Sequence, residues 1–207
     1  MPECTRVFIA IAIPEPLERQ IVRFQEELAP AIPGCRWTSA LPFHLTLAFL
    51  GDVPNSDLSA ICRVVAASAG EIEPFEIEVK GVGVFPSAIK PRVIWAGVTT
   101  PNLKLLFDLQ ESIVYSLAGI GHRPDDQRFH PHVTLGRIKY QRRGPGDLTG
   151  LIERNRLWSA EQYTVTDIEV FASTLGPAGS AYEVLGRGPL AGKKNRKSRL
   201  TCADHQC

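Results

Sequence analysis

One short pattern of residues occurs twice in the chain. Residues 44–50 read His-Leu-Thr-Leu-Ala-Phe-Leu, and residues 132–138 read His-Val-Thr-Leu-Gly-Arg-Ile. In each copy a histidine stands two places before a threonine, inside an apolar run. A β-strand points every second side chain to the same face. Each copy therefore predicts an imidazole and a hydroxyl on one face of a strand, with apolar side chains on the other.

Two such strands facing each other would combine two histidines and two threonines. Imidazole titrates near neutral pH, so one ring can act as a base while the other acts as an acid. In-line displacement at phosphorus needs this pair, together with donors to the phosphoryl oxygens, which hydroxyls can supply. We therefore expect His44 and His132 to be catalytic, and Thr46 and Thr134 to bind substrate, with no metal or other cofactor.

The repetition carries this prediction, because a single His-x-Thr on a strand is weak evidence. Such a histidine is more often a satisfied structural residue than a catalyst. The chain has only five histidines, and two of them stand in matched frames. The doubled pattern therefore favours a functional role for His44 and His132.

A basic residue follows the second copy of the pattern. Arg137 is the nearest along the chain, and a guanidinium can bind a phosphate with two parallel hydrogen bonds. We expect Arg137 to bind the substrate. Simple alternation, however, puts Arg137 on the face of Val133 and Leu135, opposite His132. A bulge, a twist or a strand end at Gly136 would be needed to turn it toward the histidine.

Three aromatic residues flank the two patterns. Trp37, Phe43 and Phe129 could stack on a base of a nucleic-acid substrate. They could equally belong to the hydrophobic core. The sequence leaves both interpretations of these rings open.

Metal and nucleophile chemistry find less support. His130 and His132 form a His-x-His pair that can chelate zinc from one strand. No carboxylate or cysteine stands close in sequence to complete the set, and Asp125 and Asp126 lie in a polar loop of unknown position. No Gly-x-Ser-x-Gly is present. Residues 81–83, Gly-Val-Gly, lack the Lys-Ser/Thr ending of a phosphate loop.

Length and composition are those of a soluble globular protein. The chain has 207 residues, of which 44% are hydrophobic and 22% charged, enough for one domain or two small lobes. Five scattered cysteines without a Cys-x-x-Cys pair fit a reducing compartment. No apolar stretch is long enough to span a bilayer, and no secretory signal is recognisable. We expect a cytoplasmic protein without a membrane partner.

Charge is distributed unevenly along the chain. Residues 193–199 carry five positive charges, whereas the chain without residues 193–207 has 18 basic and 21 acidic residues. A protein that covers a long nucleic-acid segment needs a strongly basic surface. We therefore expect a nucleic-acid ligand to be held by one end. Residues 191–207 are expected to form a disordered, solvated basic tail.

Strands and helices alternate irregularly in the pattern of apolar residues. Hairpin-like pairs of strands argue against a purely parallel sheet, so we predict an α+β fold with two similar lobes, one around each His-x-Thr strand. Asn55 or Ser56 is expected to cap the second helix. The expected strands are 5–13, 44–50, 75–85, 92–98, 132–138, 163–173 and 182–185; the expected helices are 14–29, one around 58–65, one after Pro101 and a short one at 147–157; residues 140–150 are expected to be a mobile loop.

The chain resembles the two-histidine (2H) phosphoesterase superfamily, and within it the LigT-like RNA 2′,3′-cyclic phosphodiesterases, also called 2′-5′ RNA ligases. A pair of His-x-Thr/Ser-x motifs marks the superfamily. The resemblance extends from about Arg6 to Leu190 and leaves the tail outside. Phe43 and His130 depart from it, since a polar residue and an arginine are more common at these positions, and the second change is expected to weaken phosphate affinity. Further shared features are Phe49-Leu50-Gly51, Phe85-Pro86, Pro91 to Val98, Pro131, Arg137 and the spaced pattern from Ser173 to Tyr182.

The resemblance implies one bilobal α+β domain over residues 1–190, with two antiparallel or mixed sheets and flanking helices around a central cleft. It implies metal-independent hydrolysis of a 2′,3′-cyclic phosphate at an RNA end to a 2′-phosphate. His132 would deprotonate water, and His44 would protonate the leaving 3′ oxygen, although two similar histidines can exchange these roles. The reverse reaction would join 2′-5′ ends. For a self-contained body of this size, a monomer is the default expectation.

Three other functions stay open at this point. A related 2H enzyme could act on a small 2′-linked or cyclic nucleotide. A non-catalytic protein could bind RNA ends in the same cleft, although the presence of both His44 and His132 disfavours it. A metal hydrolase built on the His130–His132 pair is the remaining alternative.

Overall fold

A computed structural model describes residues 3–39, 42–124, 128–138, 145–176 and 179–192. In chain order the elements are β1 (Cys4–Ala12), α1 (Glu15–Leu28), the 3-10 turn η1 (Ala29–Ala31), β2 (Cys35–Trp37), β3 (His44–Pro54), the 3-10 turn η2 (Asn55–Asp57), α2 (Leu58–Gly70), β4 (Phe75–Phe85), β5 (Val93–Thr99), α3 (Leu103–Gly119), β6 (His132–Ile138), α4 (Thr149–Arg154), β7 (Ser159–Val165), β8 (Asp167–Gly176) and β9 (Gly179–Pro189). None of the helices in the described part of the chain is long and apolar enough to cross a membrane.

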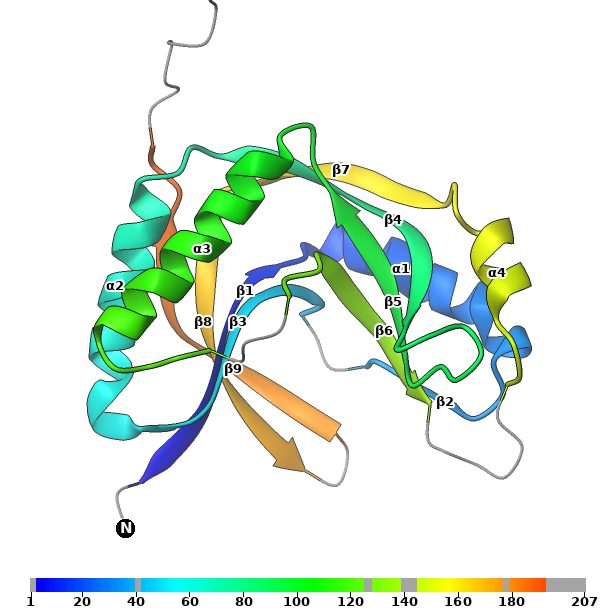
Figure 1. The fold of residues 1–207 in the computed structure, drawn as a ribbon, viewed down its shortest axis with the longest axis horizontal. Helices are drawn as coiled ribbons and strands as arrows, with labels where there is room; N and C mark the ends of the chain where they lie inside the picture. Colours follow the sequence, from blue (N-terminus) through cyan, green and yellow to red (C-terminus); the bar gives the residue numbers. More distant parts are fainter. Residues whose placement is uncertain (1–2, 40–41, 125–127, 139–144, 177–178, 193–207) are drawn as a thin grey trace, which may run out of the picture.

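The strands form one nine-stranded sheet with the order β7-β4-β5-β6-β3-β1-β8-β9, and β2 pairs with β6 outside this path. The order divides into two four-stranded halves with a motif strand, β6 or β3, at the inner edge of each. The halves are joined by one residue pair, Leu45 opposite Val133. Figure 1 shows the halves diverging from this joint. The α+β class and the antiparallel pairing are confirmed, and the two expected sheets are the halves of one.

Each motif strand is preceded in the chain by a strand and a helix. The chain runs β1-α1-η1-β2-β3 in one case and β5-α3-β6 in the other, so η1 and β2 occur only before the first motif strand. In both cases the motif strand pairs antiparallel with the strand that precedes the helix. Helices α2 and α3 lie side by side on the half that contains β1, β8 and β9, and α1 lies behind the half that contains β4, β5 and β6 (Figure 1).

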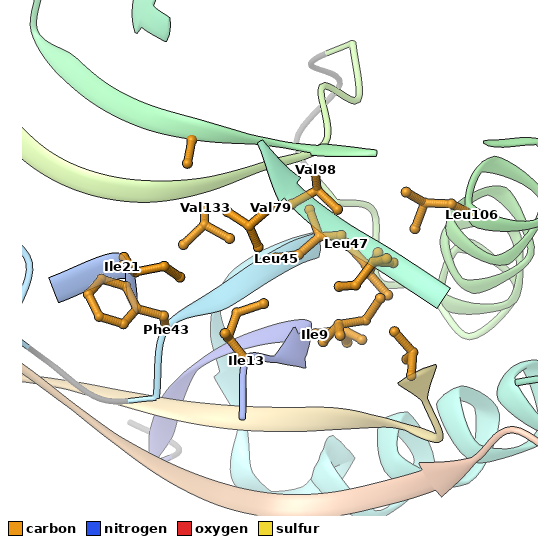
Figure 2. Close-up of a cluster of buried hydrophobic side chains, with 14 of the residues drawn as sticks. Ile9, Ile13, Ile21, Phe43, Leu45, Leu47, Val79, Val98, Leu106 and Val133 are labelled. Atoms are coloured by element: carbon orange, nitrogen blue, oxygen red, sulfur yellow. The ribbon is translucent and has the colours of Figure 1, made fainter. Parts of the chain in front are cut away.

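The hydrophobic core lies between the helices and one face of the sheet. Leu17, Ile21 and Phe24 recur at helical spacing in α1 and are buried, as expected for an amphipathic helix. Leu45 and Val133 of the joint are fully buried in the same core. Figure 2 shows them among side chains from both halves of the sheet. The core therefore fixes which face of each motif strand is left for the site.

Some expected boundaries are wrong. Residues 163–173 form the end of β7 and the start of β8 rather than one strand, because the chain passes at Thr166 from a partner of β4 to a partner of β1. Strand β3 continues past Gly51 to Pro54, since Gly51 adopts a positive φ of 69° within the strand. At Gly51 the apolar positions keep their alternation as far as Val53, whereas at Thr166 they shift by one residue between Val165 and Ile168.

The ends of other elements also differ. Neither Asn55 nor Ser56 caps α2, because both lie in the 3-10 turn η2 and Asp57 is the N-cap, without a side-chain bond. Strand β2 was not expected at all, and β9 is longer than 182–185. The short helix α4 occupies only Thr149–Arg154 of the expected span. Residues 140–144 of the expected loop and 193–207 of the expected tail lie outside the described residues.

Candidate active site

The two motif strands present their polar residues to the face opposite the core. Leu45 and Val133 are fully buried, whereas His44 and Thr46 in β3 and their counterparts in β6 are half-buried. A cleft of about 1050 Å³ opens on this face, lined by residues from β1, β2, β3, β6, β8 and β9. His44, Thr46, Thr134 and Arg137 are among its lining residues, and His132 lies beside Thr134 on the same strand.

Each motif strand contains a one-residue bulge at the same place. In β3, Leu47 has no register partner on β1, and in β6, Leu135 has none on β5. A bulge reverses the alternation of side chains beyond it. The sixth residue of each copy, Phe49 or Arg137, therefore faces the cleft with the histidine and threonine. The bulge that is needed to turn Arg137 toward the cleft is therefore present, at Leu135, one residue before Gly136.

Both catalytic candidates are oriented by the same local hydrogen bond. His44 Nδ1 lies 3.1 Å from the carbonyl oxygen of Pro42, and His132 Nδ1 lies 2.7 Å from that of His130. A carbonyl can only accept, so Nδ1 carries the proton in each ring. In the neutral state Nε2 is then the atom that can take a proton. Each strand thus holds its imidazole in the tautomer that a general base requires.

The residue before each histidine is held by a hydrogen bond to its backbone carbonyl. The carbonyl of Phe43 accepts from Ile13 N–H at 2.7 Å, and the carbonyl of Pro131 accepts from Val98 N–H at 3.0 Å. Phe43 also has an N–H, which donates to buried Glu18 Oε1 at 2.7 Å. Proline has no N–H to satisfy, so the second copy needs no equivalent of Glu18.

Aromatic rings surround both histidines. Phe8 lies 4.8 Å from His44 between ring centroids, and Tyr182 meets the same imidazole edge-on at 5.1 Å. On the other strand, Phe85 meets His132 edge-on at 5.2 Å. These rings restrict the movement of the imidazoles and limit their contact with water.

Burial lowers the pKa of both histidines. For His44 the bond to Pro42 opposes this shift, and the charge of His132 adds to it. For His132 the bond to the His130 carbonyl opposes it, while the charges of His130 and Arg137 lower the pKa further. In the unliganded protein both rings are therefore mainly neutral at pH 7. An anion placed between them would favour protonation of one ring, which yields an acid and a base from two similar groups.

Positive charge gathers in the cleft although most of the chain is slightly acidic. Arg6, Arg36 and Arg137 line it, and none of the lining residues in the described part of the chain is acidic. Arg36 on β2 stands directly opposite Arg137 on β6 in the sheet register. Guanidinium groups bind phosphate oxygens through parallel hydrogen bonds. Three of them along one cleft therefore indicate an anionic ligand.

Several lining residues were not found from the sequence. Arg36 belongs to β2, a three-residue strand that is too short for a periodic signal. Tyr182 belongs to the pattern shared with the 2H proteins, but no role followed from that pattern. Of the possible base-stacking rings, Trp37 and Phe43 are both among the residues that line the cleft. The side chain of Phe43 is only 1% exposed, however, and belongs to the core. Phe129 packs against that core as well.

The His-x-His pair is not accompanied by further metal ligands in the described part of the chain. The His130 and His132 ring centroids are 6.2 Å apart. Among the described residues no three His, Cys, Asp or Glu side chains form a group that could hold a metal ion. Asp125 and Asp126 lie outside the described residues.

Known proteins share this arrangement of sequence and fold. Residues 11–95 and 98–182 match the family model described as LigT like phosphoesterase, and each stretch contains one motif. An RNA 2′,3′-cyclic phosphodiesterase of Methanothermobacter thermautotrophicus is 34% identical over 179 residues, covering 86% of this chain and 94% of that protein. One of Thermotoga maritima is 34% identical over 180 residues, covering 87% and 92%.

Solved structures with a similar fold are also known. TT0787 of Thermus thermophilus superposes with a TM-score of 0.72 at 26% identity, covering 91% of this chain and 99% of that one. Escherichia coli LigT in its apo form superposes with a TM-score of 0.69 at 26% identity, covering 90% and 98%.

Proposed function

The chain belongs to the LigT-like phosphoesterase family, and on this premise we propose that it hydrolyses 2′,3′-cyclic phosphate ends of RNA to 2′-phosphates. The observation that carries the proposal is the pair of equivalent strands, each with an oriented imidazole and a hydroxyl on the cleft face. The relatives at 34% identity bear the name of this activity. We therefore assign the site residues by their place in the two motifs.

Each step of the reaction has a group suited to it. His132 Nε2 takes a proton from water, whose oxygen attacks the phosphorus and forms the new P–O bond. The bond from phosphorus to the 3′ oxygen breaks, and His44 gives its Nε2 proton to that oxygen. The products are a 2′-phosphomonoester and a 3′-hydroxyl, so one water is consumed. Thr46, Thr134 and Arg137 donate to the phosphoryl oxygens as charge develops on them.

A small nucleotide is the second candidate substrate. A solved complex of Escherichia coli LigT contains 3′-AMP and another contains phosphate, and a nucleotide would fill only part of a cleft of about 1050 Å³. The size of the cleft and its three arginines favour a longer polyanion. Reverse ligation of 2′-5′ ends, a monomeric state, a cytoplasmic location and the single domain over residues 1–190 stay predictions.

Identification of the product tests the function directly. The full-length protein is incubated with EDTA and a short RNA that ends in a 2′,3′-cyclic phosphate, and the new end is identified by mass spectrometry and by its sensitivity to phosphatase. We expect a 2′-phosphate end at an undiminished rate. Loss of turnover with EDTA would indicate a metal hydrolase, and turnover of only a small cyclic nucleotide would move the protein to another branch. Binding without turnover would leave a non-catalytic RNA-end-binding protein.

The lowered pKa values of the two histidines set the expected pH dependence. The free enzyme reacts when one ring is protonated and the other neutral, so kcat/KM follows a bell whose centre lies between the two pKa values. Both lie below the ordinary value of 6.5. We expect kcat/KM to peak below pH 6.5 and to fall about tenfold per pH unit on the alkaline side. Stopped assays across the pH range check this, and a flat profile between about pH 5 and 8 would contradict a paired-histidine mechanism.

A further inference from the structure

Two glutamines on different helices donate hydrogen bonds to equivalent points of the motif strands. Gln25 Nε2 in α1 donates to the carbonyl oxygen of Leu135 at 2.7 Å. Gln110 Nε2 in α3 donates to the carbonyl oxygen of Leu47 at 3.3 Å. Leu135 and Leu47 are the residues that the two bulges leave without a register partner. The support of the bulge is thus repeated along with the motif.

The two glutamines act across the halves of the sheet. Helix α1 leads into β3, but its Gln25 reaches β6; helix α3 leads into β6, but its Gln110 reaches β3. The packing agrees, because α1 contacts β7 in one half and α3 contacts β3 in the other. Each helix therefore braces the motif strand that follows the other helix in the chain.

Gln25 is the more strongly held of the two. It is 6% exposed, and its Nε2 also donates to the carbonyl of Thr38 at 3.1 Å. The Leu135 carbonyl accepts a second bond from Thr38 N–H at 2.8 Å. The amide thus ties the bulge of β6 to the chain just after β2. A buried polar group that loses its partner is costly, so the network holds one geometry.

We propose that Gln25 and Gln110 are positioning residues that keep the two bulges in register and thereby hold Arg137 and Phe49 toward the cleft. Without a bulge, strand alternation would turn these side chains to the core face. His132 precedes the bulge in β6, so loosening the bulge disturbs Arg137 more than the acid–base pair. The effect on turnover rests on the proposed function, whereas the effect on the strand does not.

The first test compares two glutamines of one helix. Gln25→Met keeps the side-chain volume and removes both donors. Gln20→Met is the matched control, because Gln20 Oε1 also bonds a strand backbone, Glu161 N–H of β7 at 3.1 Å, away from the motif strands. With the cyclic phosphate RNA, we expect Gln25→Met to raise KM about tenfold with kcat changed less than about threefold. Gln20→Met should change neither, and equal effects of both variants would overturn the proposal.

Coupling to the arginine separates positioning from general support of the fold. Arg137→Ala is combined with Gln25→Met, and KM is measured for the single and double variants. If Gln25 acts through Arg137, the glutamine change adds little once the arginine is gone. A purely structural role would multiply KM by the same factor in both backgrounds, or lower kcat alone. Either result would overturn the inference.

A measurement without substrate keeps the test independent of the reaction. Amide hydrogen exchange reports local opening of a strand. We expect residues 135–138 to exchange faster in Gln25→Met than in the wild type or Gln20→Met. In Gln110→Met, whose bond is longer and less buried, residues 47–50 should exchange faster. A wild type inactive on RNA would overturn the proposed function only, whereas unchanged exchange in both variants would overturn this inference.

Discussion

His44→Ala and His132→Ala are each expected to lower kcat by about 10²- to 10⁴-fold, because each removes one partner of a proton-transfer pair. His44 lines the cleft, His132 lies on the same face of β6 as Thr134, and neither belongs to the main core, so the variants should fold. Removing both together should cost about as much as removing one, since the two groups serve the same step. Single-turnover assays with the cyclic phosphate RNA measure these losses.

A third histidine supplies the control. His122 Nε2 pairs with Asp57 Oδ2 at 3.2 Å, and neither residue lines the cleft. His122→Ala should therefore leave kcat unchanged even if it lowers thermal stability. Retention of more than about half of the wild-type kcat by His44→Ala or His132→Ala would show that the paired imidazoles do not carry the chemistry.

The pH dependence of the residual activity assigns the two roles. A base must be neutral, so its pKa governs the acidic limb of the profile; an acid must be protonated, so its pKa governs the alkaline limb. We expect His132→Ala to lose the acidic limb and His44→Ala to lose the alkaline limb. The opposite pattern would exchange the roles of the two histidines, which the near-equivalence of their surroundings makes a real alternative.

The placement of His44 and His132 is the part of the site that the sequence predicts well. Strand alternation requires only local backbone geometry, and the buried residues Leu45 and Val133 hold the polar faces of both motifs on one side. The alternation of residues along the sequence is therefore enough to predict which side chains share a face of each motif strand. The same local reasoning places Thr46 and Thr134 beside their histidines.

The orientation of Arg137 depends on groups that are distant in the chain. Its side chain reaches the cleft because of a bulge at Leu135, and that bulge is held by Gln25 on the first helix. Strand β2, which brings Arg36 beside it, has no periodic signal of its own. The alternation pattern of one strand does not predict these contacts, because they depend on how distant parts of the chain pack together.

The boundary between β7 and β8 is another feature that the local sequence pattern does not predict. Val165 and Asp167 lie on either side of Thr166, yet their strands pair with β4 and β1 in different halves of the sheet. The choice of partner is made by the whole fold. The similarity of the two motif strands, by contrast, extends further than the sequence suggested, because the bulge and the hydrogen bond from a glutamine to its carbonyl occur in both.

Gly83, in the Gly-Val-Gly segment at residues 81–83, has a packing role that could not be predicted from the sequence. Gly83 stands directly opposite Trp95 in the register of β4 and β5, and the indole lies across it. A Cβ at Gly83 would come within 2.2 Å of Trp95 Cζ2 and Cη2. The same ring lies 4.7 Å from His130 and 6.1 Å from His132 between centroids. Glycine at position 83 therefore leaves room for the Trp95 indole, which packs beside His132.

Gly83→Ala is expected to lower the free energy of unfolding by about 1–3 kcal/mol, because the indole must leave its position. Since Trp95 contacts His132, we also expect kcat to fall about tenfold or more. Gly70→Ala is the matched control, because a Cβ at the end of α2 meets nothing within 4 Å; its stability should be unchanged or slightly higher. Urea denaturation and steady-state kinetics measure both quantities.

A second substitution identifies the indole as the cause. Trp95 Nε1 has no hydrogen-bond partner within the described part of the structure, so Trp95→Leu removes the ring without breaking a bond of that atom. If overlap with the indole causes the loss, Gly83→Ala should cost little further stability in the Trp95→Leu background. Additive losses would place the cost in the backbone of β4 instead. Wild-type stability and kcat in Gly83→Ala would show that Trp95 does not hold His132 in place.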